Sequence, residues 1–220
     1  MTISAIIFDL DGTLLDSMPV WNGLGCRFLQ ERDIEPEADL QDKLFSLSLQ
    51  QGAEYLRQTY RLSETPAQIL AGFDRMVQDS YLHRLPLKPG ISELLPALQN
   101  RRLTQLIASA SQLSWIEAAL GRTGVRGYFP AIYTCPDMRL AKDDPRFFQA
   151  ILRERGLSPD QTLVVEDALY AIRTARAAGL PTAAFFDAAS ETQWPQICQT
   201  ADFAYRSPLE LLTCPLLPAA

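Results

Sequence analysis

Close to its amino terminus the chain reads IIFDLDGTL over residues 6–14. Residues 3–8 are mostly apolar, β-branched or aromatic, and this short run predicts a buried strand. Gly12 then marks a turn. Asp9 and Asp11 therefore stand at the tip of a buried strand, where two like charges repel and burial raises the cost further. Stability does not explain this pair, so we expect a cation, a reaction or both at this point.

The composition is that of an ordinary folded protein. Its 220 residues suffice for one large domain or one domain with an insertion, and they are 47% hydrophobic and 21% charged. A net charge of −6 argues against nucleic acid or an anionic membrane as partner, but allows a small anionic substrate. The chain shows no signal-peptide pattern, and no apolar run approaches the roughly 20 residues that span a bilayer. We therefore expect a cytoplasmic protein, a monomer or weak homo-oligomer.

Histidine and cysteine are too sparse for several enzyme classes. His83 is the only histidine, which excludes a zinc hydrolase with two or three histidine ligands and a phosphatase that uses two histidines. We expect His83 at the surface of a helix. The cysteines form no CxxC pair, and we interpret them as reduced thiols: Cys26, Cys135, Cys198 and Cys214.

The segment Ser17–Arg84 has a helical pattern and no convincing strand. Residues 48–51 fit a capping box, and Thr65 followed by Pro66 fits an N-cap with proline at the first helical position. After Gly90 the pattern alternates. Strands are predicted at 103–108, 131–134, 162–165, 181–186 and 203–205, and helices at 91–98, 115–120, 147–155 and 168–178. Such alternation implies a parallel sheet with helices on both faces, to which the first strand belongs.

The helical block is therefore an insertion. We predict an α/β fold with a Rossmann-like core domain, residues 1–16 and 86–220, and a small all-helical cap domain, residues 17–85, inserted after the first strand. Hinges between the two are expected near residues 16–19 and 85–89. The proline-rich tail at 214–220 is expected to be loosely held.

In an open parallel sheet, ligands bind beyond the carboxyl ends of the strands. Reactive groups follow four of the predicted strands: Asp9 and Asp11, then Ser109 and Ala110, then Lys142, then Glu166 and Asp167. This set suits phosphoryl transfer, which needs positive charge around the transferred group and a nucleophile in line with the bond that breaks.

Acidic residues cannot face a phosphate directly, so a divalent cation must lie between them. Mg²⁺ prefers carboxylate and carbonyl oxygens. Asp9, Asp167 and the backbone carbonyl of Asp11 can supply these ligands, and Glu166 can act directly or through water. Lys142 supplies a point charge for phosphate oxygens.

Two further donors for a phosphate follow the strand at 103–108. The Ser109 hydroxyl and the backbone N–H of Ala110 can both donate hydrogen bonds to phosphate oxygens.

With these residues the chain resembles the haloacid dehalogenase superfamily of phosphotransferases. The family's DxDGT motif matches residues 9–13, and its strand-ending serine or threonine matches Ser109. Its lysine matches Lys142, and its acidic pair before an alanine-rich helix matches residues 166–167 and 171–179. The helical block is similar to the cap of the family's phosphoglycolate phosphatase and β-phosphoglucomutase branch.

The resemblance implies a hydrolase that removes phosphate from a monoester. Asp9 would attack the phosphorus and form an aspartyl-phosphate. Asp11 would give a proton to the leaving oxygen and later take one from water. Thr13 would support the loop rather than act. A closing cap excludes bulky substrates, so we expect a small phosphorylated metabolite such as a sugar phosphate.

The chain departs from the family pattern at positions that help to separate a phosphatase from the family's other activities. The family's lysine is usually followed by proline, whereas two aspartates separate Lys142 from Pro145. The mutase type carries a histidine twelve residues after the nucleophile, where this chain has Trp21. Asp11 argues against dehalogenation, because dehalogenases do not use the second aspartate as an acid.

The sequence thus predicts a Mg²⁺-dependent phosphatase. A β-phosphoglucomutase-like isomerase is the alternative, and a non-catalytic binding module is a third hypothesis. Substrate choice is expected in the cap, where the candidate residues are Trp21, Lys43, Leu49 and Arg75.

Overall fold

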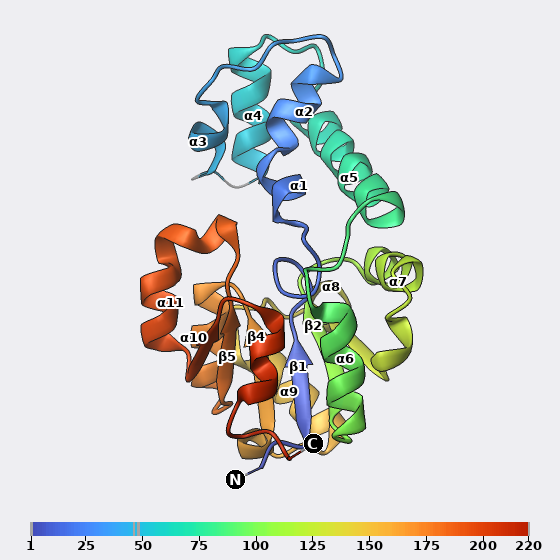
Figure 1. Ribbon diagram of the computed structural model, residues 1–220. Coiled ribbons are helices and arrows are strands. Elements are labelled where there is room, and N and C mark those ends of the chain that lie inside the picture. The colour runs from blue at the N-terminus through green and yellow to red at the C-terminus, as the bar shows by residue number, and fades with distance from the viewer. Residues whose placement is uncertain (1, 46, 48, 220) are drawn as a thin grey trace. The chain divides into compact units, whose positions relative to one another are not determined.

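The apolar run before Asp9 forms β1 (Ala5–Phe8), and all of its residues are buried. β2 (Thr104–Ser109) and β4 (Thr162–Glu166) pair with it in parallel on its two sides. The outer strands are β3 (Ala131–Thr134), β5 (Thr182–Phe185) and β6 (Phe203–Tyr205). The sheet has six strands in the order β3-β2-β1-β4-β5-β6 (Figure 1). Apolar runs as continuous as β1 are typical of strands covered on both faces.

The structure is a computed structural model that describes residues 2–45, 47 and 49–219. The chain divides into two compact units, Met1–Asp16 with Leu85–Ala220, and Ser17–Arg84. The larger unit contains the whole sheet. The smaller contains only helices among its described residues.

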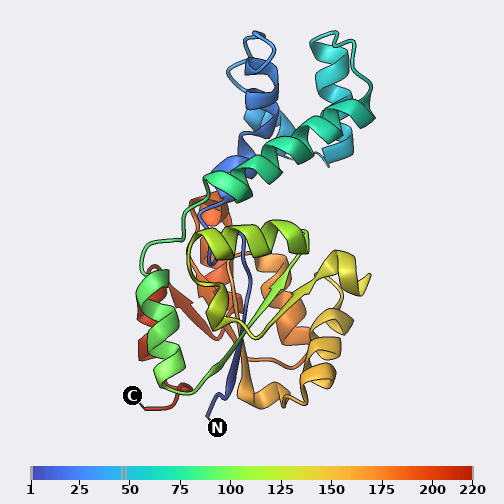
Figure 2. The same cartoon turned by 90° about the vertical axis from the view of Figure 1, so that its right-hand side faces the viewer.

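Helices cover both faces of the sheet. Helix α6 (Ile91–Asn100) and the short 3-10 helix η4 (Pro208–Thr213) lie on one face, and α9 (Pro145–Arg155) and α10 (Leu169–Ala177) lie on the other (Figure 2). The other helical elements of this unit are α7 (Leu113–Arg122), η1 (Arg126–Tyr128), α8 (Cys135–Met138), η2 (Pro159–Gln161), η3 (Ala188–Gln193) and α11 (Trp194–Thr200).

The core beneath the sheet is built from aromatic and branched side chains. Phe147 and Phe148 of α9 are fully buried and pack with Ile7 of β1 and Val164 of β4. Deleting such buried groups would leave cavities that the neighbours cannot refill. This packing keeps β1 and β4 side by side, and their carboxyl ends therefore stay together.

The smaller unit consists of α1 (Met18–Asn22), α2 (Leu24–Gln30), α3 (Leu40–Phe45), α4 (Leu49–Thr59) and α5 (Pro66–His83). Its core includes Phe28 of α2 and Phe73 of α5, whose rings meet edge to face with centroids 5.3 Å apart. Thr65 caps α5 in a capping box with Gln68, and Pro66 takes the first turn. The capping box predicted at residues 48–51 begins at Ser48, which lies outside the described residues.

The predicted α/β fold class is confirmed: the sheet is parallel and helices flank both faces. His83 is exposed at the end of α5, as expected. Within the described ranges, no helix combines the length and the apolarity that crossing a membrane requires.

The prediction of a loosely held tail is wrong. Cys214 and Leu217 are buried. The N–H of Ile3 donates to the carbonyl of Leu216 at 2.8 Å. The guanidinium of Arg101 also donates to the carbonyl of Pro218 at 3.3 Å. Prolines signalled an irregular tail, and the tail is irregular, but its apolar side chains complete the core of the larger unit.

Replacing Thr65 by alanine should lower the free energy of unfolding by about 1 kcal/mol, because the first turn of α5 loses the side-chain acceptor for a backbone N–H. Urea unfolding followed by circular dichroism measures the change. Thr65→Ser keeps a hydroxyl and should remain close to the wild type. Equal stability of all three proteins would contradict the role of the cap.

Candidate active site

The acidic site lies where the order of the strands reverses. From β1 the chain builds outward to β2 and β3, and it then crosses to β4, β5 and β6 on the other side. The carboxyl ends of β1 and β4 therefore border the crevice in which open α/β sheets bind ligands. Phe8 is in register with Val165, so the next residues, Asp9 and Glu166, emerge at the same level.

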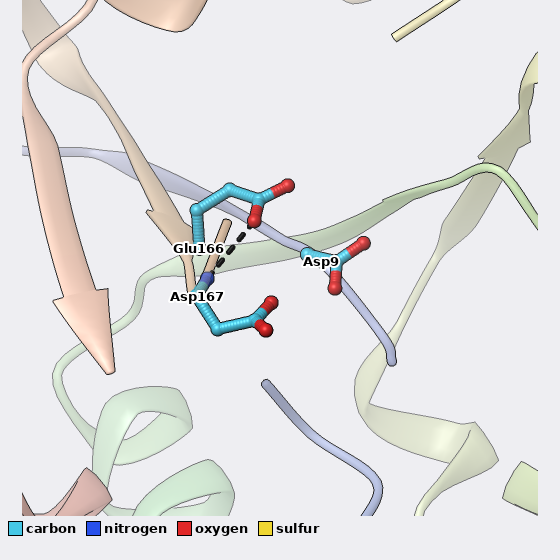
Figure 3. Close-up of side chains that lie close together, drawn as sticks. All are labelled: Asp9, Glu166 and Asp167. Atoms are coloured by element: carbon cyan, nitrogen blue, oxygen red, sulfur yellow. Dashed lines mark hydrogen bonds between the residues drawn. The ribbon is translucent and has the colours of Figure 1, made fainter. Parts of the chain in front are cut away.

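Three carboxylates gather at this edge. One oxygen from each of Asp9, Glu166 and Asp167 lies within 4.8 Å of the others (Figure 3). The three residues are only 7%, 1% and 4% exposed, respectively. Carboxylates packed this closely and shielded from water repel strongly unless a cation or a proton compensates them.

Lys142 supplies part of that compensation. It is 5% exposed, and its ammonium pairs with Asp9 and, at 2.6 Å, with Glu166. The lysine precedes α9, which Asp144 caps and Pro145 opens. One of the two aspartates between Lys142 and Pro145 therefore has a local structural role, because Asp144 is the N-cap of α9.

Glu166 uses both of its carboxylate oxygens within the protein. One oxygen binds Lys142, and the other accepts the backbone N–H groups of Asp167 at 2.9 Å and Ala168 at 3.0 Å. The side chain thereby fixes the end of β4 and orients Lys142. Direct coordination of a cation would have to share or displace these contacts.

The turn after β1 is held against the end of β4. Gly12 has φ of 82°, a left-handed conformation that glycine adopts without a steric penalty. The hydroxyl of Thr13, which is fully buried, donates to a carboxylate oxygen of Asp167 at 3.2 Å. Thr13 therefore supports the loop, as the resemblance implied.

The end of β2 supplies hydroxyl groups. The Ser111 hydroxyl donates to the carboxylate of Asp11 at 2.7 Å, and its backbone N–H donates to the hydroxyl of Ser109 at 3.0 Å. Ala110, between them, is exposed. β2 is paired directly with β1, and the Ser111 bond draws its end to the aspartate turn.

Burial dominates the electrostatics of the carboxylates. It raises the pKa of Asp9 to about 7; Lys142 opposes this shift, and Glu166 and Asp11 add to it. Burial likewise raises the pKa of Asp167 well above its usual range, reinforced by Glu166 and Asp9. Burial alone would lower the pKa of Lys142, but the carboxylates of Asp9 and Glu166 outweigh it and hold that pKa above its usual range. The site thus attracts a second positive charge beyond the lysine.

The motifs of this site identify a family. The family model described as haloacid dehalogenase-like hydrolase matches residues 6–185. The chain belongs to this family. The resemblance predicted from the sequence motifs and the assignment as a hydrolase are therefore confirmed.

Named relatives of this haloacid dehalogenase-like hydrolase include phosphatases. The chain is 21% identical over 182 residues to the phosphorylated carbohydrates phosphatase of Thermotoga maritima, covering 81% of this chain and 82% of that protein. It is 26% identical over 182 residues to hexitol phosphatase B of Escherichia coli, covering 80% of each. A solved structure from Thermotoga maritima, described as a candidate β-phosphoglucomutase, has the same fold, with a TM-score of 0.82 at 19% identity and coverage of 96% and 97%.

Most of the residues predicted for the hydrolase site converge in the structure. Asp9, Lys142, Glu166 and Asp167 are in contact or near contact, and Asp11 shares their edge of the sheet. Sequence reasoning gave no role to Ser111. Its signal was a second serine directly after the strand-ending Ser109 and Ala110, at the same strand end.

The residues considered for substrate choice belong to the helical unit. Trp21 and Leu49 line the same pocket of that unit, whereas Arg75 borders a different one. Lys43 pairs with Glu37 and Asp39 at the surface. These ion pairs do not test a role of Lys43 in substrate choice, which stays a prediction.

Without added metal, the hydrolase should lose stability as the pH rises from about 4 to about 7. The unfolded chain releases the proton of Asp9 near its ordinary pKa of 3.8, whereas the folded chain retains it up to about 7. The folded state therefore binds more protons in this window, and stability falls with pH. Thermal unfolding in a chelator at several pH values measures the slope.

Asp9→Asn should reduce this slope, because the amide does not titrate. Asp167, whose pKa burial also raises, contributes the slope that remains. Asp144→Asn is the matched control: Asp144 accepts hydrogen bonds from Arg146, which lower the pKa of its carboxyl, so its effect lies below this window. An unchanged slope in Asp9→Asn would contradict the shifted pKa.

Proposed function

We propose that this hydrolase is a Mg²⁺-dependent phosphatase of a small phosphorylated metabolite, such as a sugar phosphate, and that it works through an aspartyl-phosphate on Asp9. The observation that carries the proposal is the buried cluster of Asp9, Glu166 and Asp167 around the single ammonium of Lys142. The phosphatase names of the relatives support the substrate class.

The donor set of the cluster fits a hard divalent cation. All candidate ligands are oxygens, and three carboxylates face one ammonium, so a net negative charge awaits compensation. Asp9, Asp167 and the backbone carbonyl of Asp11 would hold Mg²⁺, and the engaged carboxylate of Glu166 fits a supporting role behind them. A bound Mg²⁺ would neutralise phosphate oxygens and allow a dianionic substrate to approach the carboxylates.

Asp9 is the proposed nucleophile. The pair with Lys142 orients its carboxylate, and its backbone N–H donates to the carbonyl of Val165 at 2.9 Å, so the residue is rigidly placed. A carboxylate oxygen of Asp9 forms a bond to phosphorus while the bond from phosphorus to the leaving oxygen breaks. Water then attacks the same phosphorus, which releases inorganic phosphate and restores the Asp9 carboxylate.

Asp11 is the proposed acid and base. Its side chain is partly exposed, and the Ser111 hydroxyl holds one of its oxygens at 2.7 Å. In the first step its carboxyl gives a proton to the leaving oxygen, and in the second its carboxylate takes a proton from the attacking water. Such general acid–base help is typically worth about 10²–10⁴-fold in rate.

The phosphate is proposed to lie between β1 and β2. The Ser109 hydroxyl accepts the Ser111 N–H and keeps its own hydrogen to donate to a phosphate oxygen. The backbone N–H of Ala110, an exposed residue, and the ammonium of Lys142 are the other proposed donors. Together these groups offset the charge of the equatorial oxygens.

Asp9→Asn should abolish Mg²⁺-stimulated hydrolysis of p-nitrophenyl phosphate, a loss of at least about 10³-fold, because the amide cannot act as the nucleophile. Release of inorganic phosphate and of nitrophenol measures the effect. Asp144→Asn changes the N-cap of α9, which lies outside the cluster, and should retain wild-type turnover. Appreciable turnover in Asp9→Asn would refute the mechanism, and a wild-type enzyme without Mg²⁺-stimulated activity would refute the function.

A panel of sugar phosphates separates the phosphatase from the mutase alternative. The phosphatase should release inorganic phosphate without forming a phosphate-shifted isomer, because the family's mutase histidine is replaced by Trp21. Phosphorus NMR of the reaction mixture follows both products at once. Accumulation of an isomeric sugar phosphate ahead of inorganic phosphate would instead favour the mutase.

A further inference from the structure

Lys88 lies partly buried at the site edge of the sheet, although neither the sequence motifs nor the proposed mechanism uses it. Its side chain is 10% exposed. The ammonium donates to the carbonyl of Gly12 at 2.7 Å, to the carbonyl of Phe186 at 2.7 Å and to the carboxylate of Asp187 at 2.9 Å. An ammonium has three N–H donors, so every one of them is used.

The three acceptors come from two strand ends that are not neighbours. Gly12 belongs to the turn after β1, and Phe186 and Asp187 directly follow β5. β4, which carries Asp167 at its end, lies between these strands. Lys88 therefore ties the turn after β1 to the end of β5, across the strand that supplies the acidic pair.

The backbone of Lys88 holds the same turn. Its N–H donates to the carbonyl of Leu14 at 2.9 Å, and the residue before it, Leu87, forms an antiparallel bridge with Leu15. Lys88 thus contacts the turn on both sides of Thr13, whose hydroxyl binds Asp167. Gly12 needs this support, because nothing in a glycine side chain restricts its conformation.

We propose that Lys88, anchored by Asp187, is a positioning residue that sets the placement of Asp11 as the general acid. The inference rests on the proposed function of Asp11. The carbonyl that Lys88 binds belongs to the residue directly after Asp11, so freeing it lets the backbone that carries the acid shift. A displacement of about 1 Å can cost about 10²-fold in rate, even when the displaced group is chemically intact.

The leaving group distinguishes positioning of the acid from general damage. Nitrophenolate leaves without a proton, whereas a sugar alkoxide needs one, so a misplaced acid slows the sugar phosphate more. Lys88→Met keeps the apolar stem and removes the ammonium. It should lower kcat/KM for the best sugar phosphate of the panel by about 10²-fold and for p-nitrophenyl phosphate by less than about tenfold. Asp11→Asn should show the same preference more strongly.

Arg101→Met is the matched control, because it also removes a cationic side chain that binds backbone carbonyls of a distant segment. Arg101 donates to the carbonyls of Leu212 at 3.1 Å and Pro218 at 3.3 Å, and it precedes β2, at the opposite edge of the sheet from the site. This variant should lose stability without changing the ratio of the two kcat/KM values. Thermal unfolding fixes a temperature at which every variant is folded.

Asp187→Ala provides a second test, independent of whether Lys88→Met folds. It removes one of the anchors of the ammonium and leaves the bond to Gly12. We expect kcat/KM for the sugar phosphate to fall several-fold and kcat/KM for p-nitrophenyl phosphate to fall less.

The inference would be overturned if the folded Lys88 and Asp187 variants had wild-type kcat/KM values, or if kcat/KM fell equally for both substrates. If Asp11→Asn showed no dependence on the leaving group, the assignment of the acid would fail instead.

Discussion

The contact between the Lys142 ammonium and the carboxylates of Asp9 and Glu166 is the constraint on which the site depends. Three carboxylates brought together out of water cannot all remain charged without compensation. One ammonium balances part of the charge, and burial, reinforced by Glu166 and Asp11, raises the pKa of Asp9. A centre that is overcharged in this way is costly for folding, and that same excess of negative charge favours binding of a cation.

The sheet supplies the rigidity that this arrangement requires. β1 and β4 are neighbours in parallel register, and the aromatic residues of α9 pack beneath both. Around this pair, the hydroxyls of Ser111 and Thr13 donate to Asp11 and Asp167, respectively. Lys88 donates to the carbonyl of Gly12, the residue after Asp11. The chemistry is therefore placed by several segments that are far apart in the sequence.

Much of the fold could be predicted because local patterns and tertiary demands agree. The strands at 131–134 and 203–205 match the structure, and the Thr65 cap begins α5 as predicted. Strand ends shifted by one or two residues because pairing with neighbours, rather than local composition, decides where a strand stops. The tail was misjudged for the same reason: prolines describe its local conformation, but the buried Cys214 and Leu217 show that packing holds it.

The sequence by itself determined the family motifs, the parallel α/β architecture and the main acidic and basic groups of the site, because these depend on residue type and on the order of strands. Only the tertiary structure decided which groups touch. Ser111 at Asp11, Thr13 at Asp167 and Lys88 at Gly12 are contacts across 100, 154 and 76 residues, respectively. No local pattern encodes such pairs, since strand order and register bring them together.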